Sequence, residues 1–209
     1  MTSKFITVEG VEGAGKTTQL TFMSAFLEGA GKPVLLTREP GGTALGEEIR
    51  TLLLGHRQEE LAPDTELLLL FAARAEHIQR VIRPALAAGT WVVCDRFTDA
   101  SYAYQGGGRG IASARIAVLE DWVQGGLRPD LTVLFDLPVE QSLARAGRRG
   151  RADRFESETL AFFQRVRNTY LELAARYPRR YRIIDASRSV AAVQAEVEAV
   201  LTTFLQGVA

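Results

Sequence analysis

The chain has 209 residues, 46% of them hydrophobic, and a formal net charge of zero. This length suits one domain with a substantial core, and the balanced charge argues against general nucleic-acid binding. No apolar run approaches the roughly 20 residues of a membrane helix, there is no signal-peptide pattern, and the single cysteine, Cys94, fits a reducing compartment. We therefore expect a cytoplasmic protein with neither a nucleic acid nor a membrane as its partner.

The first elements along the chain form a strand, a loop and a helix. The apolar run Phe5–Val8 precedes a G-x-x-x-x-G-K-T sequence, and a helical pattern follows over Thr18–Ala30. This setting predicts a phosphate-binding loop, in which glycines let backbone N–H groups face phosphate oxygens. We expect Lys16 to reach the β- and γ-phosphates and the Thr17 hydroxyl to bind Mg²⁺. The loop residues are Gly10, Val11, Glu12, Gly13, Ala14, Gly15, Lys16 and Thr17.

Four more apolar or β-branched runs alternate with helical patterns further along the chain. The runs predict strands at Val34–Thr37, Trp91–Cys94, Leu131–Phe135 and Tyr181–Ile184. Helices are predicted at 66–80, at 113–124 (capped by Ser113 and ended by Gly125–Gly126), and over the apolar stripes of 160–177 and 190–204. Continuous apolar strands separated by helices predict an α/β fold in three layers, with a five-stranded parallel sheet buried between helices on both faces.

Polar residues stand where each predicted strand ends. They are Glu9, Arg38 with Glu39, Asp95 with Arg96, Asp136, and Asp185. Ligands of open α/β sheets bind outside the carboxyl ends of the strands, so these residues are expected on the ligand side. We expect Asp136 and Asp185 to be turn or cap residues. A salt bridge between Asp95 and Arg96 is the structural alternative to a functional pair.

The predicted helix 66–80 carries a candidate base pocket. Phe71 and Arg74 lie three residues apart and share a helix face, so the ring can stack on a base while the guanidinium donates to a carbonyl edge. The structural alternatives are core packing for Phe71 and a solvated face for Arg74. The N-K-x-D sequence by which GTP switches read guanine is absent, because the only asparagine is Asn168 and no lysine follows it.

Further segments complete a family pattern. They are T-R-E-P-G-G-T at 37–43, F-A-A-R at 71–74, D-R-F at 95–97 and S-Y-A-Y-Q-G-G-G at 101–108. With the phosphate loop they resemble bacterial thymidylate kinases over essentially the whole chain. The resemblance implies a P-loop kinase fold, a single nucleoside monophosphate kinase domain over 1–209, a homodimer, and Mg²⁺-dependent transfer of the ATP γ-phosphoryl group to dTMP, giving dTDP.

The resemblance also implies roles for residues. Phe71 would stack on thymine, Arg74 would donate to its O4 edge, and Ser101 and Gln105 would lie near the rest of that edge. Tyr104 would lie where a 2′-hydroxyl would go, and Glu12 would contact the 3′-hydroxyl. Arg96 would hold the dTMP phosphate with help from Arg50, and Asp95 would orient Arg96 or water on Mg²⁺.

A basic segment after the fourth strand is the candidate lid. Some relatives carry a catalytic arginine in the phosphate loop, and this chain has none there. Transition-state charge must then be met elsewhere, and Arg148, Arg149 and Arg151 lie in a glycine-containing lid at about 145–155. The alternative is a solvated basic loop. Glu156 and Glu158 follow, where a solvated helix start is favoured over water-mediated contact with Mg²⁺.

No general base is required, because the acceptor is already a phosphate oxyanion. His56 and His77 are therefore not needed as catalysts, and His77 is expected to cap or pack. Two other functions stay open. A thymidine kinase would need a carboxylate base near a 5′-hydroxyl. A nucleotide-binding switch or assembly module would bind ATP without phosphorylating a small molecule.

Overall fold

The computed structural model describes residues 3–55, 61–146, 154–155 and 158–207. Five parallel strands form one sheet in the order β2-β3-β1-β4-β5. Each strand begins where the sequence predicts and runs one residue further, so that the polar residue at its carboxyl end belongs to it. The strands are β1 Phe5–Glu9, β2 Val34–Arg38, β3 Trp91–Asp95, β4 Leu131–Asp136 and β5 Tyr181–Asp185.

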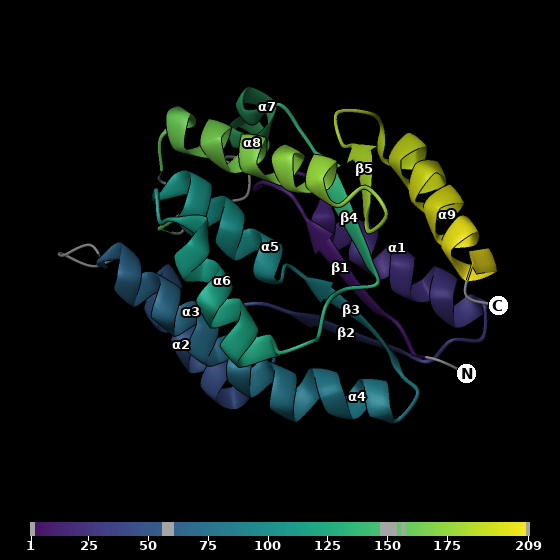
Figure 1. Ribbon diagram of the computed structural model, residues 1–209. Helices are drawn as coiled ribbons and strands as arrows, with labels where there is room; N and C mark the ends of the chain where they lie inside the picture. The colour runs from purple at the N-terminus through teal and green to yellow at the C-terminus, as the bar shows by residue number, and fades with distance from the viewer. Residues whose placement is uncertain (1–2, 56–60, 147–153, 156–157, 208–209) are drawn as a thin grey trace.

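Helices cover both faces of this sheet, as predicted. Figure 1 shows α1 and α9 on one side, and α3, α5, α6 and α8 on the other. The helical elements are α1 Lys16–Gly29, α2 Ala44–Leu54, α3 Pro63–His77, the π-helical turn η1 Ile78–Ile82, α4 Arg83–Ala87, α5 Thr98–Ser101, the π-helical η2 Tyr102–Gly108, α6 Ser113–Gln124, α7 Val139–Ala146, α8 Leu160–Arg176 and α9 Val190–Gly207. The predicted helix 66–80 is thus α3 continued by η1.

The ends of α6 test a capping prediction. Gly125 follows the helix with a positive φ of 55°, as expected of a terminating glycine. Ser113 is the first helical residue and not the cap, because Ala112 occupies the N-cap position and no side chain caps the helix there. The predicted helix is correct, and its predicted capping bond is wrong.

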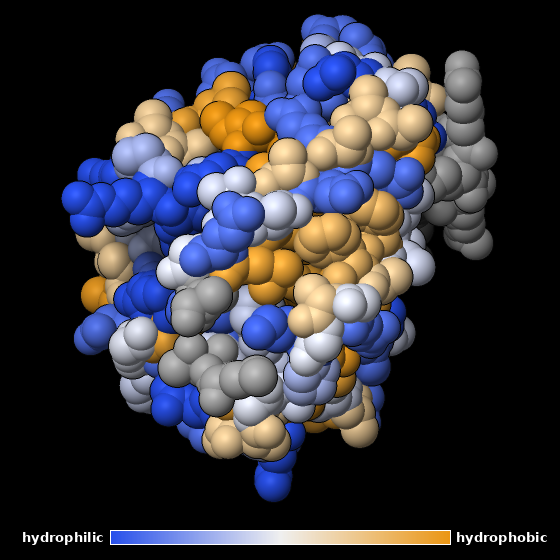
Figure 2. Space-filling view, turned by 90° about the vertical axis from the view of Figure 1, so that its right-hand side faces the viewer, coloured by the Kyte–Doolittle hydropathy of each residue, from blue (hydrophilic) through white to orange (hydrophobic). Residues whose placement is uncertain are grey.

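Burial differs between the central and the edge strands. The apolar residues of β1, β3 and β4 are buried, whereas Leu36 of β2 is 42% exposed and Ile183 of β5 is 48% exposed. The expectation of burial on both faces is therefore correct for three strands and wrong for the two edges. Helices therefore leave part of the two outer strands exposed. On the side of α1 and α9, the surface shows apolar patches between hydrophilic side chains (Figure 2).

The register places the strand ends together. Val8 of β1 and Arg38 of β2 both pair with Asp95 of β3, so Glu9, Asp95 and Arg38 lie at one edge of the sheet. Within the described residues, no helix is both long and apolar enough to cross a bilayer. The polar ends of β1, β2 and β3 lie where the phosphate loop leaves β1.

Candidate active site

A cavity of about 620 Å³ opens at the carboxyl edge of the sheet. The phosphate loop, the ends of β2 and β3, and side chains of α2, α3, α5 and η2 form its walls. Of the residues selected from the sequence, those that line it are Glu12, Gly13, Ala14, Gly15, Lys16, Thr17, Arg50, Arg74, Asp95, Arg96, Ser101, Tyr104 and Gln105. Residues of distant segments therefore meet in one place, as the resemblance implies.

The phosphate loop has the backbone that its glycines allow. Gly10 and Gly13 have φ values of 137° and 75°, which L side chains rarely adopt. A Cβ added to Gly10 would lie 2.5 Å from the carbonyl oxygen of Phe135, so β4 packs directly against the loop. Gly10 and Val11 lie beneath the cavity and do not line it. The loop is thus fixed by backbone packing from below.

Lys16 begins α1 with its ammonium group inside the loop. Its Nζ donates to the carbonyl oxygens of Gly10 and Val11, each at 3.0 Å. Burial lowers the pKa of Lys16, and the neighbouring Arg96 lowers it further. Two carbonyl groups satisfy this buried cation only in part. A phosphate bound in the loop would supply the negative charge that the ammonium group lacks.

Arg96 lies at the end of β3 in a left-handed conformation, with φ of 68°. Its Nη2 is 2.5 Å from Oε1 of Glu12, and its guanidinium lies 4.7 Å from the ring centre of Tyr104. The Tyr104 hydroxyl donates to the same carboxylate at 3.3 Å. Arg96 pairs with Glu12 and not with Asp95, so the predicted alternative of a strand-end salt bridge is wrong.

A buried carboxylate beneath this group was not singled out as a site residue. Glu9 accepts a hydrogen bond from the backbone N–H of Phe97 and another from the Tyr170 hydroxyl, both at 2.8 Å. Burial raises the pKa of Glu9 to about 8, and Asp99 adds to the rise. The Tyr170 hydroxyl also lies 3.5 Å from Nη1 of Arg96. The only signal in the sequence was the place of Glu9 at a strand end.

Arg74 occupies the other end of the cavity and is 2% exposed. Its Nε donates to Glu39 at 2.7 Å, and its Nη2 donates to the Phe97 carbonyl at 3.2 Å and to the Ser101 hydroxyl at 3.1 Å. Its buried Nη1 has no partner among the described residues. The predicted alternative of a solvated face is wrong, and Nη1 of Arg74 is a buried donor group without a described partner.

Phe71 does not line the cavity, although the sequence places it beside Arg74. Its ring is 2% exposed and packs with Leu67, Ile111 and Ile116. Leu70, the residue four positions before Arg74, lies on the cavity side instead. Leu70 and Phe71 lie about 100° apart around the helix, on either side of Arg74, and only Leu70 faces the cavity, so the predicted aromatic wall is wrong. The Phe71 ring supports the guanidinium from behind, at 4.6 Å.

Gln105 completes the Arg74 end of the cavity. Its Nε2 donates to Oε1 of Glu66 at 2.8 Å. Glu66 is fully buried on α3 and also accepts from Arg154 at 2.6 Å and from Arg109 at 3.4 Å. The sequence does not mark Glu66 as a site residue, because a single glutamate in the first turn of a helix is typical of a solvated position.

The oxygen atoms near the phosphate loop suit a Mg²⁺ ion. Thr17 and Asp95 both line the cavity, and the buried Oδ1 of Asp95 has no partner among the described residues. Mg²⁺ prefers oxygen ligands and binds to few protein groups when substrate phosphates supply the others. No cluster of three or more acidic, histidine or cysteine side chains that could hold a metal ion occurs in the part of the chain described.

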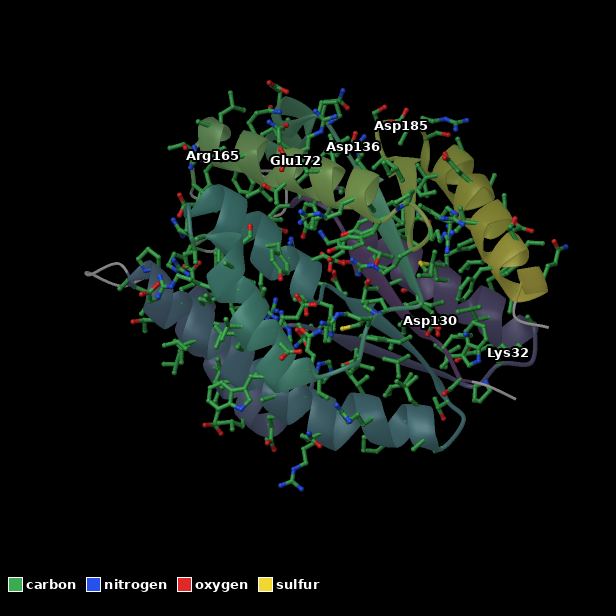
Figure 3. The ribbon with its side chains drawn as sticks, viewed as in Figure 1. Lys32, Asp130, Asp136, Arg165, Glu172 and Asp185 are labelled. Atoms are coloured by element: carbon green, nitrogen blue, oxygen red, sulfur yellow. The ribbon has the colours of Figure 1, made fainter. Side chains whose placement is uncertain are left out.

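Other predicted residues have structural contacts. His77 is buried between Glu39 at 3.0 Å and Thr37 at 2.6 Å, so it packs as expected. Asp185 accepts bonds from Ser187 in a turn, as predicted. Asp136 forms a two-pronged ion pair with Arg167 of α8, which is structural but not the predicted turn. Figure 3 shows Asp136 and Asp185 at the carboxyl end of the sheet and Asp130 at the opposite end.

Arg50 of α2 lines the cavity and donates to the Pro40 carbonyl at 2.9 Å.

The lid segment is described only at its ends. Phe155 lines the cavity and its ring contacts that of Tyr104. Glu158 pairs with Arg109 at 2.5 Å and not with a residue of the phosphate loop. Arg148, Arg149, Arg151, Glu156 and His56 lie outside the described residues.

Comparisons with known proteins identify the family of this chain. A family model described as thymidylate kinase matches residues 8–197. The chain is 61% identical over 201 residues to the thymidylate kinase of Pseudomonas putida (strain GB-1), covering 96% of each, and 60% identical over 206 residues to that of Pseudomonas savastanoi pv. phaseolicola, covering 99% of this chain and 98% of the relative. A crystal structure of thymidylate kinase from Ehrlichia chaffeensis aligns with a TM-score of 0.77 at 36% identity, over 97% of this chain and 99% of that one.

The pKa of Glu9 predicts how stability depends on pH. The ordinary value of 4.5 applies to the unfolded chain, and the folded value is about 8. Between these values the folded protein retains a proton that the unfolded chain releases, so the contribution of Glu9 to the free energy of unfolding falls as pH rises. Glu9→Gln keeps the shape without the charge. We expect its stability relative to the parent protein to increase from pH 5 to pH 8 in urea titrations.

Glu28→Gln, on the exposed face of α1, is the matched control and should keep a constant difference from the parent protein. If the Glu9→Gln difference is also constant over this range, Glu9 titrates normally and the buried-carboxyl description is wrong.

Proposed function

The chain belongs to the thymidylate kinase family, and from its cavity we propose that it transfers the γ-phosphoryl group of ATP to dTMP, giving dTDP, with Mg²⁺ bound beside the phosphates. The observation that carries this proposal is that one cavity combines a phosphate-binding end with a second end suited to a base. The phosphate loop with Lys16 forms one end, and the unpartnered Nη1 of Arg74 lies at the other. A nucleoside triphosphate and a base-bearing acceptor can therefore meet between them.

The chemistry follows from alignment and charge. The acceptor oxygen is already ionised, so no group must remove a proton from it. Lys16 would contact the β- and γ-phosphates, and Arg96 would hold the acceptor phosphate. Mg²⁺, when bound, would neutralise charge on the donor phosphates, with Thr17 and Asp95 as the residues that hold it. These cations surround the transferred group where negative charge spreads in the transition state.

The base would lie against Leu70 and the Arg74–Ser101–Gln105 group. Arg74 Nη1 would donate to the O4 carbonyl of thymine, and Leu70 gives an aliphatic wall in place of the aromatic plate expected at Phe71. Phe97, which also lines this cavity, adds apolar surface near the guanidinium, at 5.2 Å from it. The pocket therefore combines two apolar contacts with directed polar groups, as small-ligand sites do.

The sugar would lie beside Tyr104 and Glu12. Tyr104 lines the cavity and holds its hydroxyl on Glu12, which suits a deoxyribose with no 2′-hydroxyl in that space. Glu12 would accept a hydrogen bond from the 3′-hydroxyl. It pairs with Arg96 in this structure, so acceptor binding would set a phosphate against Arg96 while Glu12 turns to the sugar.

A thymidine kinase is the competing enzyme. It would need a carboxylate base at the 5′-hydroxyl, whereas Arg96, in the cavity beside Glu12, suits an acceptor that already carries a phosphate. An assay of ADP release across dTMP, dUMP, dCMP, dGMP, dAMP and thymidine decides among the functions. We expect dTMP to be preferred. Turnover of thymidine alone would support the competing enzyme, and ATP binding without any transfer would support a switch or assembly module.

The assembly is proposed as a homodimer through α3 and α6. Val118 and Trp122 follow Arg115 at helical spacing on α6, and Leu68 follows Asp64 on α3. The Asp64–Arg115 ion pair at 2.8 Å places these stripes side by side. Trp122 is 82% exposed, Val118 66% and Leu68 56%, a continuous apolar surface that a second copy would cover. We place the reaction in the cytoplasm, where the free thiol of Cys94 would stay reduced.

Replacement of Arg74 tests base recognition. Arg74→Ala removes the donor to O4, so we expect the preference for dTMP over dCMP, measured as a ratio of kcat/KM values, to fall by about tenfold or more. Arg80→Ala is a control on the exposed surface of η1, where the arginine pairs only with Glu76 in the described part of the chain. An unchanged dTMP preference in a folded Arg74→Ala variant would remove Arg74 from the base site.

The lid arginines stay a prediction from the sequence. Arg148→Ala, Arg149→Ala and Arg151→Ala should lower kcat more than they raise the KM for dTMP, because their charge would act in the transition state. Steady-state kinetics of each variant provide the measurement. Wild-type turnover in all three would mean that these residues form a solvated loop.

The proposed dimer surface is tested with Trp122→Glu. Burying a carboxylate in an apolar interface is strongly unfavourable, so we expect monomers in sedimentation velocity at micromolar concentrations. Val190→Glu, at an exposed apolar position that begins α9, is the control and should leave the assembly unchanged. A Trp122→Glu protein that sediments like the parent would place the interface elsewhere.

A further inference from the structure

Glu66 is a buried charge that the proposed reaction does not use. It lies in the first turn of α3 with no exposed surface, and it accepts hydrogen bonds from three side chains. Two of the donors are the guanidinium groups of Arg109 and Arg154, and the third is the amide of Gln105 at 2.8 Å. Burying a carboxylate is unfavourable, and these partners compensate for the lost contact with water. They do not explain why the carboxylate lies beside the cavity.

The contact with Gln105 has a direction. A carboxylate accepts hydrogen bonds and cannot donate them, so only the NH₂ end of the amide can face Glu66. The carbonyl end would meet the carboxylate with repulsion. Gln105 is 2% exposed and lines the cavity, and no described residue donates to its Oε1. The side-chain carbonyl oxygen is therefore available as an acceptor.

Gln105 and Arg74 together present an ordered pair of polar groups. Ser101 accepts from Nη2 of Arg74 at 3.1 Å and lies four residues before Gln105 in the continuous helical stretch of α5 and η2. Arg74 can only donate, through its unpartnered Nη1. With its NH₂ group held by Glu66, Gln105 presents its carbonyl oxygen, an acceptor, to the cavity. The cavity thus offers one donor and one acceptor in neighbouring positions.

This order matches one class of pyrimidine. Thymine and uracil present the O4 acceptor and the N3–H donor, whereas cytosine presents an amino donor and a bare N3 acceptor. A freely rotating amide could present its NH₂ group to N3 of cytosine and satisfy half of that edge. An amide held by Glu66 cannot, so cytosine meets donor against donor and acceptor against acceptor.

We propose that Glu66 is a positioning residue that sets base specificity, by fixing the Gln105 amide so that its carbonyl oxygen faces the N3–H of a 4-oxopyrimidine. This role rests on the proposed dTMP kinase function. Glu66 touches no substrate. It acts through Gln105, and Arg109 and Arg154 hold the carboxylate in place.

Glu66→Gln tests the role with little change of shape. A glutamine at 66 can face either end of the Gln105 amide, so the fixed direction is lost. We expect the ratio of kcat/KM for dTMP to that for dCMP to fall by about tenfold or more. The ratio of dTMP to dUMP should change by less than about twofold, because both bases have the same O4 and N3–H groups. Glu76→Gln, which weakens a surface ion pair with Arg80 near the end of the same helix, is the matched control.

A double-mutant cycle with Gln105→Ala separates positioning from general loosening of the site. If Glu66 acts through Gln105, the Glu66→Gln change has no effect on the dTMP-to-dCMP ratio once Gln105 is alanine. A similar fall of the ratio in both backgrounds would overturn the proposal. So would an unchanged ratio in a folded Glu66→Gln single variant.

The parent protein offers a second measurement that does not depend on the folding of the variant. In side-chain NMR, with the Gln105 resonances assigned by comparison with Gln105→Ala, dTMP binding should shift the Cδ carbonyl signal and leave the NH₂ signals nearly unchanged. The reverse pattern would overturn the proposal. Failure of the parent protein to phosphorylate dTMP would instead reject the proposed function, so the two failures are distinguishable.

Discussion

The site depends on one strained residue at the end of the central strand β3. Arg96 adopts a left-handed backbone that costs an L residue about 1–2 kcal/mol. Its N–H donates to the Val8 carbonyl at 2.9 Å, and the next N–H, of Phe97, donates to Glu9. These bonds to β1 hold the turn, so the guanidinium points at the phosphate loop while Phe97 turns toward Arg74. One turn therefore links the phosphate end of the cavity to the base end.

Both ends of the cavity use the same physical device, a buried carboxylate behind a polar group. Glu39 holds Nε of Arg74, Glu66 holds the amide of Gln105, and Glu9 holds the Phe97 N–H that shapes the Arg96 turn. Burying a carboxylate is unfavourable, and apolar residues would give a more stable core. What Glu39 and Glu66 provide is direction, because an ionised carboxylate can only accept and so leaves its partner with a defined remaining face.

The fold could be predicted from the sequence because its signals are local. A buried parallel strand is a short apolar run, and all five strands were found with an error of one residue at the carboxyl end. The cause of that error is that the backbone of each polar end residue pairs in the sheet, whereas its polar side chain is typical of a loop at the edge where ligands bind. The burial of β2 and β5 could not be predicted, because the order of strands in the sheet is not a local property.

The site was predicted in part. The phosphate loop, Arg74, Arg96 and Gln105 stand in recognisable segments, and the structure brings them into one cavity. Phe71 shows the limit of such reasoning. Spacing of three residues places two side chains on neighbouring rows of a helix, but which row faces the ligand depends on the element packed behind it. Here α6 covers Phe71, and Leu70 is left to face the cavity.

The replacement of a ring by Leu70 changes which contacts can select the base. An aliphatic wall accepts any flat pyrimidine, and space around a single methyl group separates thymine from uracil by only ~1–3 kcal/mol. Polar mismatch is a stronger filter, since a buried donor left without an acceptor costs the full desolvation of that group. In the proposed function, discrimination against cytosine would therefore come from Arg74 and Gln105, whose side chains are oriented by Glu39 and Glu66. The carboxylates behind the pocket, more than its apolar walls, would then decide which base fits.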